Sequence, residues 1–135
     1  MSIPQPTSRL ARIAAAIFSG GCLALVAPPA NLWWLHWFSW VPLIWALYPG
    51  TVKQNLRLGY FAGWFGMCSI FFWIIETVQR FSDLNYPWSV FILALFATAF
   101  GLYYAVTWGT AMWFRKHFGW HWVLLTPAMH VAMEN

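Results

Sequence analysis

Apolar residues along this chain gather in five long segments, separated by short clusters of proline, glycine and charged residues. The apolar segments cover about residues 10–27, 32–48, 56–75, 88–114 and 120–135. Their runs are continuous rather than alternating, which favours helices over strands. Helices of roughly 17–25 residues cross the ~30 Å hydrocarbon layer of a membrane, so the first four segments are long enough. The pattern predicts an all-α membrane protein, a multi-span transmembrane helix bundle with four complete spans and a truncated fifth.

The second segment begins at a proline-rich turn that is dense in tryptophan. Between Ala27 and Leu47 the chain holds five of its twelve Trp and three of its eight Pro residues, and no Asp, Glu, Lys or Arg. Tryptophan is enriched at membrane–water interfaces, and a helix surface exposed to water does not lack charges over such a length. The stretch predicts a tight turn at the membrane boundary, followed by a span that starts in an aromatic belt.

The composition makes lipid the expected solvent of these segments. Of the 135 residues, 61% are hydrophobic and only 7% are charged, whereas about 25% of residues are charged in average soluble domains. A soluble domain of this size could not hide so much apolar surface, because small domains bury a smaller fraction of their surface than large ones. The net charge of +4 does not indicate a nucleic-acid partner, since the basic residues stand singly or in pairs at segment ends.

The basic residues predict the orientation of the spans. Six of the seven lie in three regions that would share one side of the membrane: Arg9, Arg12, Lys53, Arg57, Arg115 and Lys116. Only Arg80 lies on the opposite side, in a loop with Glu76 and Asp83. Because Lys and Arg are enriched on the cytoplasmic side of membrane proteins, we expect residues 1–9 to form a cytoplasmic tail and residues 10–135 one transmembrane helical domain.

Small residues recur at helical spacing in the third and fourth segments. They are Gly59, Gly63 and Gly66 in the third, and Ala97, Gly101, Ala105 and Gly109 in the fourth. Such residues let helix backbones approach closely in lipid. The pattern fits helix packing alone, and it also fits packing that leaves a groove for an acyl chain; both interpretations stay open.

Few polar side chains are candidates for a site in contact with lipid. Glu76 closes the third segment and Arg80 follows four residues later, so the two are predicted to share one helix face. They would form either an interfacial ion pair or, with Trp73 beside the acyl region, a site for a lipid phosphate near the outer headgroups. Glu134 lies deep in the fifth segment, where an acidic residue is either a functional group or a structural partner of another helix.

The chain shows no pattern for catalysis or for a cofactor. It has no Ser/His/Asp set at plausible spacing, no glycine-rich phosphate loop and no zinc-binding HExxH motif. Cys22 and Cys68 lie in apolar segments without a CxxC or a Cys/His pair at metal spacing, and are expected to be small apolar fillers. The histidines do not converge at ligand spacing: His36, His117, His121 and His130. We therefore expect no catalytic residue, no cofactor and no metal in this chain.

Several short motifs occur in an order that resembles one known family. Residues 28–35 read P-P-A-N-L-W-W-L, and residues 37–43 read W-F-S-W-V-P-L. The third segment ends in F-W-I at 72–74, the fourth contains L-Y-Y at 102–104, and residues 126–134 read T-P-A-M-H-V-A-M-E. Their order and spacing over nearly the whole chain resemble apolipoprotein N-acyltransferase, an integral membrane enzyme of bacterial lipoprotein maturation.

The resemblance implies an enzyme of the bacterial inner membrane, in which a nitrilase-like domain with a Glu-Lys-Cys catalytic set follows the membrane helices. The family transfers an acyl chain from phospholipid to the N-terminal diacylglyceryl-cysteine of lipoproteins, so membrane phospholipid and a lipoprotein substrate are the implied partners. The fifth segment would reach only roughly 24 Å as a helix, short of the ~30 Å core. We expect the chain to be the N-terminal membrane part of such an enzyme, a fragment that ends before the catalytic domain, anchors it, guides lipid and is inactive alone.

Two other interpretations stay open at this stage. A five-span, tryptophan-rich membrane protein that binds a ligand or acts as a sensor, similar to the TspO family, would suit the length. The pattern W-x-P-x-x-W-x-L-Y at 40–48 faintly resembles a helix of that family, and saturable binding of a porphyrin or a sterol would favour it. The third possibility is a multi-span protein with structural contacts only.

Overall fold

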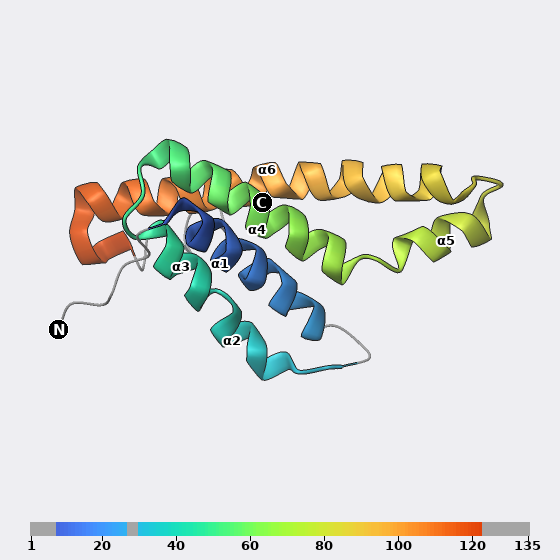
Figure 1. Ribbon diagram of the computed structural model, residues 1–135, viewed down its shortest axis with the longest axis horizontal. Coiled ribbons are helices and arrows are strands. Elements are labelled where there is room, and N and C mark those ends of the chain that lie inside the picture. The colour runs from blue at the N-terminus through green and yellow to red at the C-terminus, as the bar shows by residue number, and fades with distance from the viewer. Residues whose placement is uncertain (1–7, 27–29, 123–135) are drawn as a thin grey trace.

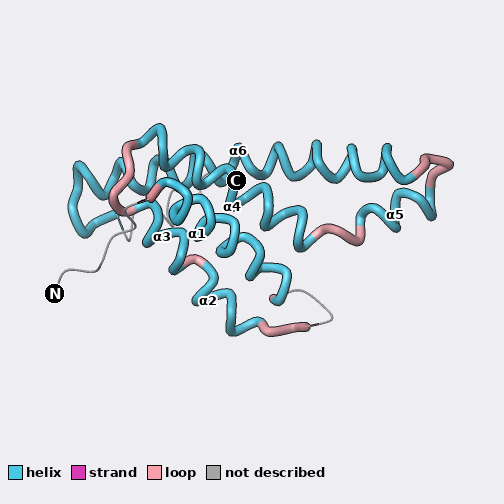
Figure 2. Tube along the Cα trace, viewed as in Figure 1, coloured by secondary structure: helices cyan, strands magenta, loops and turns pink. Residues whose placement is uncertain are grey.

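The computed structural model describes residues 8–26 and 30–122, which form helices and connecting turns without a strand (Figure 2). In chain order they are α1 Arg9–Cys22, η1 Leu23–Leu25, η2 Trp33–Leu35, α2 His36–Ser39, α3 Val41–Leu47, α4 Val52–Ile70, α5 Ile74–Phe81, α6 Tyr86–Phe118 and η3 Gly119–His121. The predicted all-α class is confirmed for these residues. The fifth apolar segment lies almost wholly outside them, and the number of spans stays a prediction.

The first two apolar segments form a hairpin in which α1 lies beside α3 (Figure 1). The Ser8 side chain begins α1 by accepting a hydrogen bond of 3.1 Å from the Ala11 N–H, as an N-cap residue does. The second segment, predicted as one span over 32–48, is instead divided into η2, α2 and α3. Proline at position 42 explains the break, because it has no N–H to donate and its ring clashes with the carbonyl four residues earlier.

The third apolar segment is bent rather than straight. Thr51 and Gln54 form a capping box that begins α4 at Val52, before the expected start. The apolar segment predicted as a span over 56–75 is interrupted in the structure, since α4 ends at Ile70 and α5 continues at an angle of 53° to it; whether the pair crosses as one span stays a prediction. The break falls on three consecutive aromatic residues at 71–73, and the ring of Phe71 packs edge-on against Phe96 of α6 with 5.2 Å between centroids.

The longest helix, α6, has 33 residues and is apolar enough to cross a membrane. It begins at the N-cap Asn85 with proline in its first turn and ends before Gly119, whose φ of 59° favours glycine. Only 28% of its most apolar stretch is buried within the protein, which is unlike the core helix of a soluble domain. Within the described residues, α4 and α5 would make a second candidate span if the bent pair crosses as one unit.

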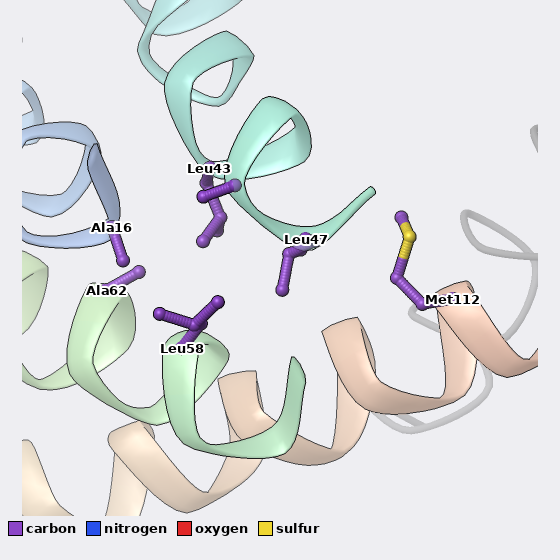
Figure 3. Packing of buried hydrophobic residues seen from close by; sticks show 7 residues of the cluster. Ala16, Leu43, Leu47, Leu58, Ala62 and Met112 are labelled. Atoms are coloured by element: carbon purple, nitrogen blue, oxygen red, sulfur yellow. The ribbon is translucent and has the colours of Figure 1, made fainter. Parts of the chain in front are cut away.

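The core lies where α1, α3, α4 and α6 meet (Figure 3). Its buried residues are Ala16, Leu43, Ala46, Leu47, Leu58, Ala62 and Met112. Ser19 adds a polar contact between α1 and the second segment, because its hydroxyl donates to the Ser39 carbonyl oxygen. The core therefore sits at the end of the bundle where α1 and α4 begin and α6 ends.

The small residues lie where α4 contacts α6 and where α4 contacts α1 and η1. All seven are buried: Gly59, Gly63, Gly66, Ala97, Gly101, Ala105 and Gly109. A Cβ on Gly59 would lie 2.9 Å from the Tyr104 carbonyl oxygen, and one on Gly101 would lie 3.0 Å from the Tyr60 ring. At these two positions the neighbouring helix, rather than an open groove, occupies the space beside the glycine. Gly66 faces α1 and η1 instead, with Leu23 beside it.

Candidate functional site

The two ends of the bundle carry different charges, and the candidate sites lie at these two ends. Among the described residues, the Asp, Glu, Lys and Arg side chains at the end formed by the starts of α1 and α4 and the end of α6 are all basic: Arg9, Arg12, Lys53, Arg57, Arg115 and Lys116. The opposite end, where α5 meets the start of α6 (Figure 1), carries Glu76, Arg80 and Asp83. The sequence-predicted headgroup residues therefore lie on a part of the molecule remote from most of its positive charge.

Trp73, Glu76 and Arg80, the residues predicted to lie near the lipid headgroups, share one segment of the chain. We call this segment the bend and define it as residues 71–81, which include α5. Trp73 precedes α5, and its carbonyl oxygen accepts hydrogen bonds from the N–H of Thr77 at 3.0 Å and from its hydroxyl at 3.1 Å. The Trp73 side chain is half exposed. Arg80 Nη2 donates to Glu76 Oε1 at 2.9 Å one turn later, which places both side chains on one face of α5. The structure thus brings Trp73, Glu76 and Arg80 onto one short element.

The Glu76–Arg80 ion pair is open to its surroundings, since the side chains are 76% and 69% exposed. Exposed pairs at this helical spacing contribute only about 0.3–0.5 kcal/mol to stability. Arg80 also keeps donors that the single contact to Glu76 does not use, because a guanidinium carries five. The pair therefore adds little to stability, and Arg80 is free to exchange Glu76 for a phosphate.

Exposed aromatic side chains lie on the same end of the bundle as this ion pair. They come from the bend and from the first turns of α6: Phe72, Trp73, Phe81, Tyr86, Trp88 and Phe91. Aromatic rings of this kind occupy the interface between headgroups and hydrocarbon. The arrangement of one arginine, one acid and an aromatic fringe is suited to holding a zwitterionic or anionic headgroup. It does not provide a nucleophile with an activating base.

Other predicted residues do not join this site. Cys22 and Cys68 are half-buried free thiols in α1 and α4. Within residues 8–26 and 30–122, no three His, Cys, Asp or Glu side chains lie close enough together to hold a metal ion. Glu134 lies outside the described residues.

A small apolar hollow was not foreseen from the sequence. It has a volume of about 280 Å³ and is lined by Leu23, Val26, His36, Ile70 and Tyr104. Its walls come from four separate elements, so no local motif could reveal it. Two of the lining residues also contact Trp40: the Tyr104 ring stacks on it with 5.5 Å between centroids, and His36 lies edge-on to it.

Comparison with known protein families identifies one relationship. Residues 19–135 match the family described as the apolipoprotein N-acyltransferase N-terminal domain. Curated protein sequences give no significant match to the chain. The family match includes the whole of α4, α5 and α6, and with them the bend and its aromatic fringe.

Proposed function

Because the chain belongs to the apolipoprotein N-acyltransferase N-terminal domain family, we propose that it serves as the membrane-embedded N-terminal part of such an enzyme in the bacterial inner membrane. The observation that carries this proposal is the family match over residues 19–135. In the complete enzyme an acyl chain would pass from phospholipid to the N-terminal diacylglyceryl-cysteine of a lipoprotein. This part would anchor the enzyme and guide lipid, while a nitrilase-like domain would supply the nucleophile.

The proposed orientation puts the basic end in the cytoplasm and the bend on the outer side. The positive-inside tendency of membrane proteins supports it, since six of the seven basic residues lie at one end of the described helices. The long apolar α6 would connect the two sides. In this orientation Trp73, Glu76 and Arg80 face the leaflet from which the acyl donor would come.

The bend would act as a platform at the outer headgroups. The turn of 53° directs α5 away from the axis of α4, so α5 can lie along the interface instead of continuing through it. Ile75 and Val78 are partly buried, whereas Glu76 and Arg80 are exposed, which is the amphipathic character of interfacial helices. Arg80 would meet the lipid phosphate, and the aromatic fringe would border the acyl chains.

The alternative of a TspO-like ligand-binding protein gains nothing from these observations. The family match points to the acyltransferase family.

The lipid-guiding role is tested by photo-crosslinking. The full chain is reconstituted in liposomes with a phospholipid that carries a photoreactive group next to its phosphate, and crosslinked peptides are mapped by mass spectrometry. We expect crosslinks on residues 71–81, and we expect Arg80→Gln to reduce them severalfold. Glu76→Gln is the matched control, because it frees Arg80 without removing its charge and should leave the crosslinks undiminished. Wild-type crosslinking in Arg80→Gln would refute the role of Arg80.

A further inference from the structure

The basic end of the bundle contains a hollow of about 540 Å³ between the start of α1 and the first turns of α4. We call it the arginine pocket and define it by Arg9, Arg12, Arg57, Gln54, Ile13 and Phe61. Three guanidinium groups and one amide line one part of it, and apolar side chains line the rest. The starts of α1 and α4, which line it, lie toward the end of the molecule opposite α5 (Figure 1).

Arg12 is fixed in place by oxygen atoms that carry no charge. Its Nε donates to the Ala46 carbonyl oxygen at 2.7 Å, and Nη1 donates to Gln54 Oε1 at 2.9 Å. Nη2 lies 3.5 Å from Oδ1 of Asn55, a side chain that is only 2% exposed. Gly50 leaves the space that this arrangement needs, since a Cβ there would overlap both Nη2 of Arg12 and Oδ1 of Asn55. The guanidinium is therefore oriented before any ligand arrives.

The positive charge of this pocket has no acidic partner among the described residues. The acidic side chains among the described residues are Glu76 and Asp83, and both lie at the opposite end of the molecule. The one ion pair between described residues joins Glu76 to Arg80. Partly buried charges are normally paired, because removing a charge from water is costly. Three arginines around one hollow also repel one another. A bound anion would remove both costs.

We propose that the arginine pocket binds a phosphate ester. Arginine holds phosphate oxygens through charged N–H donors. Arg9 and Arg57 are exposed at the rim and would supply them, while Arg12, held by Ala46, Gln54 and Asn55, adds a fixed positive charge beside them. Ile13 and Phe61 would contact a hydrocarbon chain attached to the phosphate. A phospholipid with a net negative headgroup supplies both parts, whereas free phosphate supplies only the first. The site is separate from the proposed acyl-transfer function and does not depend on it.

A neighbouring hollow of about 920 Å³ provides the matched control. It shares Pro49 with the arginine pocket and is lined by Lys53, Lys116 and Arg115. There, Arg115 contacts Tyr48: its Nη2 donates to the Tyr48 carbonyl oxygen at 2.8 Å, and its guanidinium lies 3.8 Å from the centre of the Tyr48 ring. Its buried Nε has no hydrogen-bond partner among the described residues. If the basic residues served only to orient the chain in the membrane, removing charge from either hollow would have the same effect on the binding of a phosphate ester.

The test follows thermal unfolding of the purified full chain in detergent by tryptophan fluorescence, with three added probes. Dioleoylphosphatidylglycerol has chains and a phosphate ester, dioleoylglycerol has the same chains without phosphate, and inorganic phosphate has no chains. A ligand that binds the folded state raises Tm as its concentration exceeds Kd. We expect phosphatidylglycerol to raise Tm at lower concentration than inorganic phosphate, and dioleoylglycerol to have no comparable effect.

Two double variants locate the effect. Arg9→Gln/Arg57→Gln removes two exposed charges from the pocket. It should raise about tenfold or more the phosphatidylglycerol concentration needed for a given rise in Tm, since hydrogen bonds to charged groups are worth at least that factor in Kd. Lys53→Gln/Lys116→Gln removes the same charge from the neighbouring hollow and should change the required phosphatidylglycerol concentration less than about twofold. A response to inorganic phosphate alone, with the same dependence on Arg9 and Arg57, would retain the site and identify free phosphate as its ligand.

Three results would overturn the proposal. The first is an equal loss in both double variants, which would reduce the pocket to a generally basic surface. The second is stabilisation by dioleoylglycerol as strong as by phosphatidylglycerol, which would make the phosphate irrelevant. The third is the absence of any shift with phosphatidylglycerol and with inorganic phosphate.

Discussion

Single residues determine how closely the helices of this protein approach each other. Gly20 and Gly21 are neighbours in α1, yet a Cβ on Gly20 would overlap the Ala62 carbonyl oxygen of α4, whereas one on Gly21 would meet no atom within 4 Å. Two adjacent glycines do not reveal which one faces the partner helix, so the sequence could not predict this contact. The hydrogen bonds of Arg12 were equally hidden, because their partners lie 34 to 43 positions away in the chain.

The glycine contact leads to a prediction about stability. Gly20→Ala should destabilise the full chain by about 1–3 kcal/mol, since the Ala62 backbone cannot yield as a flexible side chain would. Gly21→Ala should be neutral or stabilising by up to ~1 kcal/mol, because alanine favours the helix and has room there. Thermal unfolding followed by tryptophan fluorescence measures both. Equal destabilisation by the two variants would contradict the α1–α4 contact described above.

At the scale of elements, apolar length predicted the existence of helices better than their continuity. The segment expected at 88–114 is one helix, α6, lengthened at both ends to Tyr86–Phe118 by the Asn85 cap and by continuation to Gly119. The segments at 32–48 and 56–75 are interrupted within apolar runs. Hydropathy cannot report these breaks, because they fall at Pro42 and at three aromatic residues at 71–73, none of which makes the segment more polar.

The orientation of α5 is open to direct measurement. A nitroxide label on Gln79, an exposed residue of α5, should report headgroup depth in liposomes if α5 lies along the interface. A label on Leu95, which is 62% exposed on α6, should report the hydrocarbon core. Both labels are introduced as cysteine variants after Cys22→Ala and Cys68→Ala, and depth is read from relative collision rates with oxygen and a water-soluble nickel complex. Equal depths at the two positions would rule out an interfacial α5.

At the scale of the whole molecule, the family could be recognised from the order of weak motifs, and the match over residues 19–135 confirms it. The asymmetry of charge was also readable, because each basic residue stands at a segment end. The arrangement that gives each end its chemistry was not readable from the sequence. The aromatic fringe at the bend combines α5 with the start of α6, and the arginine pocket combines α1 with α4. Both depend on tertiary contacts between segments that are distant in the chain.

The proposed role of this chain is to form the membrane part of an apolipoprotein N-acyltransferase. Its most direct test replaces the corresponding N-terminal region of a bacterial apolipoprotein N-acyltransferase with this chain and measures N-acylation of a diacylglyceryl lipopeptide by mass spectrometry. We predict that the chimera forms the N-acylated product and that the isolated chain, in the same liposomes, does not. A chimera that is inserted in the membrane and folded but forms no product would contradict the claim, as would product formation by the isolated chain.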